Sequence, residues 1–411
     1  MNKKLGLAVA GAVLALSSAA QAGIIIPAGD WTLDISGNVN AYYQNTRASG
    51  GDWSAAGVAN SGVTMGRDAK GDRVMNTIGT GLLPAWIGFS GKTRQNDLDV
   101  SFTISMQPNV SDNGITGDGA TPGSQTNTFL NRQTFLTFGD ASWGSVKLGK
   151  DLGVFGSDAI LSDMTLLGVG GGSSLPTVDN TTLGGIGTGY IYAAWKGQIA
   201  YTTPNFNGFQ ATVALTNPNQ AVEVTGLTNY QDRLGMEGKA SYSWAGDVSG
   251  KAWVGFATYD VTTNGAAANT YTATAYELGA TANVGNLGLT GYYYNGKGVG
   301  TTFMGFLGAD ANGKKRDSNG GYIQATYVIP TGTKLGASYG ISKLDDTDLD
   351  RSSNFAMVES NRRWTIGAYH PLTKSLNLVA EYNDLKSEAQ NYVNVSDAKS
   401  KNISLGAILF F

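Results

Sequence analysis

The chain of 411 residues has no cysteine and a single histidine, His370. The lack of cysteine excludes disulfides and thiol chemistry, and with only one histidine it also excludes a zinc site built from these two residue types. His370 precedes Pro371 in a predicted short turn and has no evident partner that would make it a catalytic base. We therefore expect no enzyme activity, no metal site and no cofactor.

Long hydrophobic runs are also missing. The longest continuously apolar run is residues 5–16, and a membrane-spanning helix needs ~18–20 such residues, so a helical membrane protein is excluded. Two lysines precede this run, and Ala20 and Ala22 follow it in an A-x-A cleavage pattern. We predict a secretory signal peptide at residues 1–22, removed before Gly23. An uncleaved membrane anchor is the alternative.

Charge of neither sign is abundant. The 28 basic and 31 acidic residues become 26 and 31 once the two lysines of the predicted signal peptide are removed, which gives a net charge of −5. This balance excludes a typical nucleic-acid-binding surface, so no nucleic-acid partner is expected. The mean hydropathy of −0.13 is that of many soluble proteins, but a membrane barrel can share it because only alternate strand residues face lipid.

What the chain does contain is strands that alternate between apolar and polar side chains. In residues 31–44 the polar face is too hydrophilic for a packed core but suits a water-filled lumen. Residues 401–411 alternate to the end of the chain, with an apolar face of Ile403, Leu405, Ala407, Leu409 and Phe411. Such a strand fits the closing strand of a barrel in a membrane, with the terminal aromatic ring at the lipid boundary.

The same alternation predicts sixteen strands. Short turns rich in proline and glycine alternate with long polar loops, which is the plan of an outer-membrane barrel, and sixteen strands enclose an aqueous channel. We therefore predict an all-β fold, a transmembrane antiparallel β-barrel that occupies residues 23–411. The predicted strands are 31–44, 83–90, 98–107, 129–138, 145–150, 190–203, 209–216, 232–244, 249–259, 274–284, 287–295, 322–329, 334–341, 363–370, 375–385 and 402–411.

Charged residues in the predicted strands follow the same alternation. Seven of them fall on polar faces, opposite apolar residues. A lysine or arginine that faces lipid near the midplane costs ~2–4 kcal/mol, so we expect all seven in the lumen. They are Lys196, Arg233, Glu237, Lys239, Glu277, Arg363 and Glu381.

The third long loop, residues 151–189, is too apolar to lie free in water. We expect it to fold into the lumen, pack on the barrel wall and narrow the channel. A loop packed across the outer mouth is the alternative. Besides Asp158 and Asp163, the loop contains Phe155, Ile160, Leu161, Met164, Leu166, Leu167 and Val169.

Two charged clusters lie in other outer loops. Lys314, Lys315 and Arg316 form a basic cluster that we expect to be solvated. A second cluster lacks the glycine and the distal glutamate of an EF-hand, so a solvated loop is favoured, with divalent-ion bridging to surface lipid as the alternative. Its members are Asp345, Asp346, Asp348 and Asp350.

Over its whole mature length the chain resembles the Gram-negative general porins. Residues 148–150 (Leu-Gly-Lys) are similar to the Tyr-Gly-Arg that precedes the third loop of that family, and residues 158–164 are similar to its loop motif of Asp-Ala, a spacer and Asp-Met. Residues 85–89 (Ala-Trp-Ile-Gly-Phe) resemble its Ala-Arg-Leu-Gly-Phe, and residues 131–135 resemble its Thr-Arg-Leu-Ala-Phe. The terminal Phe411 is shared. The resemblance implies a sixteen-stranded homotrimer that passes small hydrophilic solutes.

The resemblance also implies a constriction with a basic and an acidic side. Arg132 and Lys150 would form the basic side, with Asp158 and Asp163 as the acidic side. Trp86 stands where the family has an arginine, and the loop glutamate of the family has no acidic counterpart, so we expect weak ion selectivity and a preference for solutes with a hydrophobic part. With Lys147 and Lys196 added from strand alternation, the predicted constriction residues are Trp86, Arg132, Lys147, Lys150, Asp158, Asp163 and Lys196.

These observations predict a passive diffusion channel in a bacterial outer membrane. Its expected partners are outer-membrane lipid and lipopolysaccharide, further copies of the chain in a homotrimer, and small hydrophilic solutes and ions. Two other classes stay open. Saturable block by one solute would identify a substrate-selective porin with a binding site at the constriction, and absence of ion conductance would favour a structural or adhesive barrel.

Overall fold

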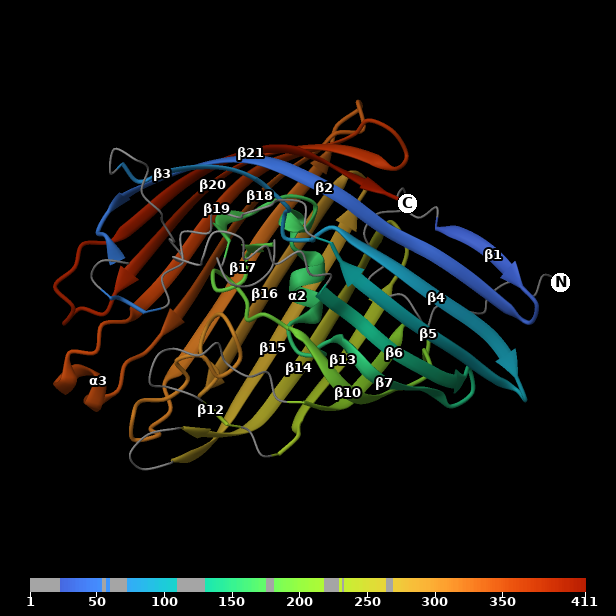
Figure 1. Cartoon of the computed structure of the whole chain (residues 1–411), viewed down its shortest axis with the longest axis horizontal. Helices are drawn as coiled ribbons and strands as arrows, with labels where there is room; N and C mark the ends of the chain where they lie inside the picture. Colours follow the sequence, from blue (N-terminus) through green and yellow to red (C-terminus); the bar gives the residue numbers. More distant parts are fainter. Residues whose placement is uncertain are drawn as a thin grey trace, which may run out of the picture.

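The computed structural model describes residues 23–53, 57–59, 72–108, 130–174, 181–217, 229–230, 233–263 and 269–411. Within these residues, one antiparallel sheet of nineteen strands curves round and closes on itself (Figure 1). Three of the nineteen are short extensions of the wall, so the wall itself has sixteen strands and the predicted fold class is confirmed. The predicted signal peptide, residues 1–22, lies outside the described residues and stays a prediction.

The wall strands follow one another round the barrel in sequence order, and each corresponds to one of the sixteen predicted strands. The predictions 98–107 and 209–216 agree to the residue. The wall consists of β2 (Trp31–Gly50), β4 (Trp86–Gln95), β5 (Leu98–Gln107), β6 (Leu130–Asp140), β7 (Gly144–Leu152), β10 (Trp195–Thr202), β11 (Phe209–Thr216), β13 (Gly235–Trp244), β14 (Val248–Thr263), β15 (Thr270–Val284), β16 (Leu287–Lys297), β17 (Asp317–Val328), β18 (Lys334–Leu344), β19 (Val358–Pro371), β20 (Leu376–Ala389) and β21 (Ala398–Phe410).

Shorter elements extend the wall or lie in the loops. β1 and β3 pair with the two ends of β2, and β12 pairs with β14. No helix among the described residues is long and apolar enough to cross a membrane. The shorter elements are β1 (Ile24–Ala28), β3 (Val74–Gly79), α2 (Ser157–Ser162), the 3₁₀ helix η1 (Met164–Leu167), β8 (Gly171–Ser174), β9 (Thr182–Gly184), β12 (Asn229–Tyr230) and α3 (Asp348–Ser353).

The C-terminal strand closes the barrel, as predicted. β21 pairs with β20 on one side and with β2 on the other, where Leu409 lies opposite Val39. At the chain end the Gly37 N–H donates to the Phe411 carbonyl (2.8 Å), and the Phe411 N–H donates back to the Gly37 carbonyl (3.1 Å). β1 then continues along the same edge of β2 beyond Phe411. This edge of β2 therefore stays paired along its length, as a strand in a membrane requires.

Some predicted strand ends and one predicted lumenal charge were wrong. The turn expected at residues 91–97 contains only Asn96 and Asp97, both with positive φ (47° and 63°), because a two-residue hairpin turn lets β4 and β5 pair to their ends. The strand expected from residue 190 begins at Trp195 because the preceding residues belong to the third loop. Arg233 lies before the start of β13 and pairs with Asp260 at 3.3 Å, so it does not occupy a strand face.

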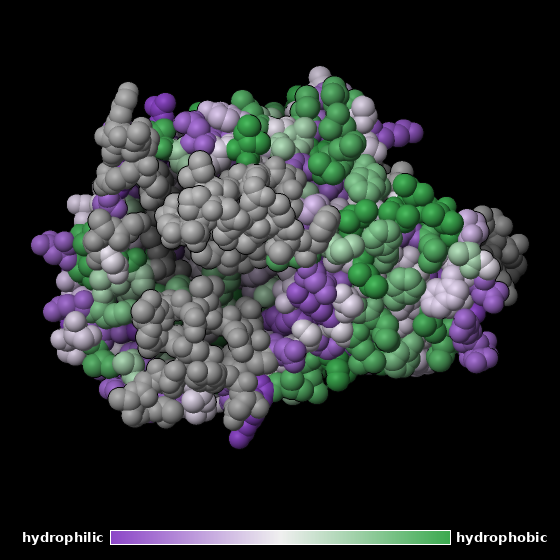
Figure 2. All heavy atoms as spheres, viewed as in Figure 1, coloured by the Kyte–Doolittle hydropathy of each residue, from purple (hydrophilic) through white to green (hydrophobic). Residues whose placement is uncertain are grey.

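The two faces of the wall have the character that the alternation predicts. Outward residues are apolar and exposed, such as Ile199, Leu278 and Ile366 at 54%, 56% and 55%. Figure 2 shows apolar residues gathered at the end of the molecule where β4 to β7 lie in Figure 1. The remaining six predicted lumenal charges point inward, where they contact the third loop or one another.

Candidate pore constriction

The described part of the third long loop, residues 153–174 and 181–194, lies inside the ring of strands (Figure 1). Most apolar side chains in this part of the loop are buried, with Phe155 and Ile191 at 1% and 0% exposure. They share one apolar cluster with inward-facing tyrosines of the wall. A loop packed this way fills part of the lumen, which is the arrangement expected from its composition. The tyrosines are Tyr42, Tyr259, Tyr271, Tyr292, Tyr294, Tyr322 and Tyr369.

Buried wall glutamates hold the loop by its backbone. Glu237 on β13 accepts hydrogen bonds through Oε2 from the N–H groups of Val154 and Phe155, at 2.6 and 3.0 Å. Glu277 on β15 accepts a hydrogen bond from the Gly156 N–H at 2.9 Å. A carboxyl oxygen is a good acceptor, so each glutamate satisfies amides that the loop cannot pair within itself.

Residues 167–170, in the middle of the loop, are held in the same way. Glu381 on β20 accepts hydrogen bonds through Oε2 from the N–H groups of Val169 and Gly170, at 2.9 and 2.8 Å. The Tyr42 hydroxyl donates to the Leu167 carbonyl at 2.7 Å. The loop is therefore fixed to the wall at several strands far apart round the barrel.

Asp163 organises the loop from within. Its Oδ1 accepts a hydrogen bond from the Thr165 N–H (2.9 Å) and so caps η1. Its Oδ2 accepts hydrogen bonds from the Tyr190 hydroxyl (2.9 Å) and the Gly185 N–H (3.1 Å), and lies 3.4 Å from Nη2 of Arg363 on β19. Asp163, one of the predicted acidic residues, is 3% exposed. It joins the segment around η1 to the segment around Gly185 and Tyr190 in the same loop.

Asp158, in the first turn of α2, bridges two wall lysines. Its Oδ2 lies 2.6 Å from Nζ of Lys239 on β13, and its Oδ1 forms an ion pair with Lys251 on β14. Lys196 lies nearby on β10 and is 5% exposed. Its Nζ is 2.7 Å from Glu237 Oε1. These contacts bring two predicted residues, Asp158 and Lys196, to one side of the constriction.

Arg132 reaches the lumen through a β-bulge. Across β5 and β6, Ser105 pairs with Gln133 and Met106 with Asn131, so Arg132 is an extra residue in β6. The Arg132 Cζ atom lies 5.0 Å from the centre of the Trp86 ring and 4.5 Å from that of Trp195. The guanidinium is therefore held by stacking on two indole rings.

The two remaining predicted lysines are placed differently. Lys147 faces inward on β7, forms an ion pair with Asp151, and lies 4.8 Å from the centre of the Phe135 ring. Lys150 lies on the opposite, outward face of the same strand, and its Nζ donates to the Asn131 carbonyl at 2.7 Å. The structure thus brings Lys147 to the constriction side of the wall but does not bring Lys150 there.

Sequence reasoning did not identify the anchoring glutamates or the two lysines of Asp158 as site residues. Strand alternation placed Glu237, Glu277, Glu381 and Lys239 in the lumen without indicating what they contact. A usable signal was present, because a loop that folds into a lumen brings unpaired amides that need acceptors on the facing wall.

Features that could suggest other chemistry are part of the wall. Residues 336–340 spell G-x-S-x-G but lie inside β18, not at a strand-to-helix turn, and Ser338 is buried. His370 Nδ1 lies 3.0 Å from Thr333 Oγ1 near a short turn. Among the described residues, no group of three histidine or acidic side chains is placed to hold a metal ion.

Comparisons with known proteins agree with this architecture. The family model described as "Gram-negative porin" matches residues 6–390, whereas a comparison with curated proteins finds no match. The outer membrane channel DcaP of Acinetobacter baumannii is 18% identical with a TM-score of 0.64, and the match covers 94% of this chain and 99% of that one. An anion-selective porin from Comamonas acidovorans is 16% identical with a TM-score of 0.61, covering 93% and 100%.

Salmonella typhi OmpF, solved in complex with daunomycin, is 18% identical with a TM-score of 0.58, and the match covers 93% of this chain and 100% of that one. At these identities the structures establish a shared fold, while the family match spans nearly the whole sequence. The chain belongs to the Gram-negative porin family, and it is a channel of the bacterial outer membrane for passive diffusion of small solutes.

Proposed function

We propose that solutes cross this porin through a constriction between the third loop and the wall from β4 to β14, and that the constriction favours anions. The observation that supports a preference for anions is that the lysine side chains at the constriction are more exposed than their carboxylate partners. The side chains of Lys147 and Lys251 are 32% and 33% exposed, whereas those of their partners Asp151 and Asp158 are 9% and 10% exposed. The wall glutamates are turned toward the loop backbone. A passing ion therefore meets a positive field, which lowers the barrier for anions.

The direction of this preference is supported by one structurally similar protein, which is named an anion-selective porin. The constriction we propose contains Trp86, Arg132, Lys147, Asp158 and Lys196 of the residues predicted from sequence. Asp163 acts in it by holding the loop together. Because lysine and carboxylate are paired at two points, we expect a modest preference for anions and not strict selectivity.

The test is the reversal potential of single channels in a tenfold gradient of potassium chloride. We expect the wild-type potential to have the sign of anion preference, and Lys251→Glu to shift it toward cations because it reverses an exposed charge at the constriction. Lys374→Glu, in the short turn between β19 and β20, makes the same charge change and should leave the potential unchanged. A wild-type channel that prefers cations, or equal effects of the two variants, would refute the proposal.

A substrate-selective channel is the second candidate, favoured by the surroundings of Arg132. Arg132 is 4% exposed, and its Nε and Nη1 atoms have no hydrogen-bond partner among the described residues; the same holds for Nε1 of Trp86. Buried donors without partners are costly and suit a bound acceptor such as a carboxylate. Saturable block of chloride current by an aromatic carboxylate, lost in Arg132→Gln, would support this function. Block that is equal in both proteins would exclude it.

The assembly and lipid partners are also part of the proposal. We infer a homotrimer because one structurally similar protein, OmpT of Vibrio cholerae, was solved in a trimer form. Contact with lipopolysaccharide is supported by lysine and arginine side chains on the outward face at the loop ends of β2, β18 and β21, where lipid phosphates would lie. They are Arg47, Lys343, Lys399 and Lys401. A heat-sensitive trimer band, and weaker lipopolysaccharide retention in Lys399→Gln/Lys401→Gln, would test both points.

A further inference from the structure

A second loop is folded into the outer mouth of the barrel. It is the connection between β16 and β17, residues 298–316, and it is buried over most of its length, with Val299, Met304 and Ala309 at 0%, 2% and 7% exposure. These three residues belong to the same apolar cluster as Ile186 of the third loop. Strand alternation did not predict this packing, because the segment is rich in glycine and its apolar residues follow no regular period.

The folded loop covers the return limb of the third loop, residues 187–194. The Tyr192 N–H donates to the Thr302 carbonyl at 2.9 Å, and the rings of Tyr192 and Phe303 meet edge to face with centres 6.2 Å apart. A Cβ atom at Gly187 would lie 3.4 Å from Cβ of Thr302. The return limb leads directly into Trp195, which stacks on Arg132 at the constriction.

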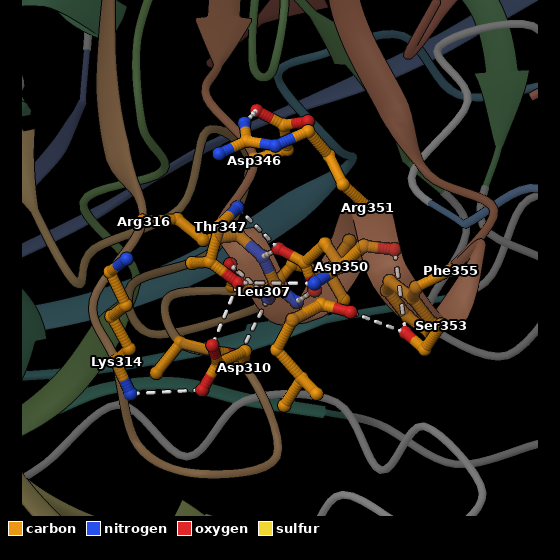
Figure 3. Close-up of polar contacts among 12 residues, drawn as sticks. Leu307, Asp310, Lys314, Arg316, Asp346, Thr347, Asp350, Arg351, Ser353 and Phe355 are labelled. Atoms are coloured by element: carbon orange, nitrogen blue, oxygen red, sulfur yellow. Dashed lines mark hydrogen bonds and ion pairs between the residues drawn. The ribbon is translucent and has the colours of Figure 1, made fainter. Parts of the chain in front are cut away.

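A buried ion pair fixes the neck of the folded loop (Figure 3). Nη1 of Arg316 donates to the carbonyls of Leu307 and Ala309, at 3.0 and 2.6 Å, and so closes the loop on itself. Nε and Nη2 of Arg316 donate to the two carboxylate oxygens of Asp350 on α3, at 2.7 and 2.5 Å. Arg316 and Asp350 are each 2% exposed, so the expectation that both clusters are solvated was wrong for these two residues.

Asp350 is itself held in place, so the pair has a rigid base. The Thr347 N–H donates to Asp350 Oδ2 at 2.9 Å, and the Thr347 hydroxyl donates to Asp310 Oδ2 at 2.7 Å. The Phe355 ring lies 5.4 Å from the Arg316 Cζ atom. The loop after β18 therefore clamps the neck of the loop after β16 from two sides (Figure 3).

We propose that residues 298–316 position the constriction, with the Arg316–Asp350 pair as the latch that keeps them docked on the third loop. Asp350 holds Arg316, and Arg316 in turn holds the Leu307 and Ala309 carbonyls of the folded loop. Thr302 and Phe303 of the same loop then contact Tyr192. When the latch is open, the return limb loses its cover, and the third loop moves at the constriction. The inference rests on the proposed channel through that constriction, and it adds the element that keeps the open state steady.

The test compares current fluctuations of single channels. Arg316→Met/Asp350→Leu removes the latch without leaving a buried charge unpaired, which is the tolerated way to remove such a pair. The matched control is Lys314→Met/Asp348→Leu, which removes an exposed ion pair between the same two loops, with side chains 59% and 78% exposed. We expect brief closures about five- to tenfold more often in the latch variant, at the low end of couplings between distant sites, and wild-type closures in the control.

A disulfide provides a rescue that a merely structural role would not predict. The chain has no cysteine, so within one chain Gly187→Cys/Thr302→Cys can form only the intended bridge. A Cβ atom at residue 187 would lie 3.4 Å from Cβ of Thr302, near the disulfide range of about 3.5–4.5 Å. When the two cysteines are added to the latch variant and oxidised, the frequency of brief closures should return to the wild-type value. Reduction of the disulfide in the same bilayer should raise the frequency again. The reduced form also reports any strain from replacing Gly187, whose φ is 75°.

The proposal would be overturned by equal closure rates in the latch variant and its control, or by frequent closures that the disulfide does not suppress. It would also be overturned by a wild-type closure rate in Phe303→Ala. The last variant removes the ring contacts of Phe303 with Tyr192 and Phe306 but leaves the latch in place. It carries the test if the latch variant does not assemble. A wild-type protein that conducts no ions would instead refute the channel function itself.

Discussion

Lys196 on β10 and Glu237 on β13 face each other inside the barrel with Nζ and Oε1 2.7 Å apart, and their side chains are 4% and 0% exposed. The same carboxylate holds two amides of the third loop. One ion pair thus joins the wall to the loop that narrows it. Lys196 places a cation directly beside the buried carboxyl group of Glu237.

Removal of Lys196 is therefore expected to destabilise the barrel strongly. Lys196→Met leaves a buried carboxylate without its cation, which costs about 3–5 kcal/mol in other proteins. Equilibrium unfolding in denaturant and detergent would measure the loss. Arg94→Met provides the comparison, because the Arg94 side chain is 49% exposed in its pair with Asp140 and solvent screens such surface pairs. Equal losses in the two variants would contradict the expectation.

The anchoring role of Glu381 predicts a local effect. In Glu381→Gln the neutral amide is a weaker acceptor, so the N–H groups of Val169 and Gly170 should exchange with deuterium about tenfold faster, since a hydrogen bond to a charged group contributes about 1.5–3 kcal/mol. Exchange mass spectrometry of peptides covering these residues would measure it. Glu359→Gln, an exposed residue on β19, should change nothing there. An unchanged rate in Glu381→Gln would mean that the anchor does not hold the loop.

The stability that the Arg316–Asp350 latch contributes should depend on pH. Burial raises the pKa of Asp350, but hydrogen bonds from Arg316 and Thr347 outweigh this and lower it below its usual range. A carboxyl with a lowered pKa in the folded state stabilises the fold fully above the unfolded value of about 4, and loses this contribution as the pH falls through the folded value. The difference in unfolding free energy between wild type and Asp350→Asn should thus be constant from pH 5 to 8 and shrink below pH 4.

The control for this acid dependence is Asp345→Asn, because Asp345 is exposed in the same loop. Its unfolding free energy should track that of the wild type across the whole pH range. A gap between wild type and Asp350→Asn that stays constant down to pH 3 would show that the latch carboxyl does not titrate as the contacts imply.

Trp86 should influence which anions pass. Trp86→Arg removes an indole face beside Arg132 and adds a second guanidinium, so the permeability of benzoate relative to chloride should fall about two- to fivefold. Reversal potentials with mixed salts would measure this ratio. Trp143→Arg, in the short turn between β6 and β7, is the matched control. An unchanged ratio in Trp86→Arg would remove the aromatic contribution from the proposed mechanism.

The last two residues should contribute to closing the barrel and to its assembly in the outer membrane. Removal of Phe410 and Phe411 deletes the hydrogen bonds of Phe411 to Gly37 and the one from the Phe410 N–H to the Ser375 carbonyl (2.9 Å). By its resemblance to general porins, the terminal Phe411 is also expected to be recognised during outer-membrane assembly. The truncated chain should therefore lose more yield in cells than in refolding from urea into detergent. Equal losses in both would indicate an effect on stability alone, and normal trimer yield in cells would contradict both roles.

The wall was predictable because one rule, two-residue alternation, governs every strand that faces water on one side and lipid on the other. That rule placed Glu237 and Glu381 in the lumen and Leu405 on the lipid side. It could not place Arg132, because a bulge breaks the alternation, nor the loop after β16, because glycine-rich loops carry no periodic signal. Contacts such as Asp350 with Arg316 join loops that are separate in sequence, and only the closed wall brings them together.

The bulge in β6 shows how the interior of such a channel can change in evolution. Because Ser105 and Met106 keep neighbouring partners on either side of the extra residue, one inserted codon adds a lumenal cation and leaves the pairing of the rest of β6 intact. A slip of the whole strand would have turned every side chain to the wrong face. New permeation properties can thus arise at a single position of a wall whose other residues must all stay in register.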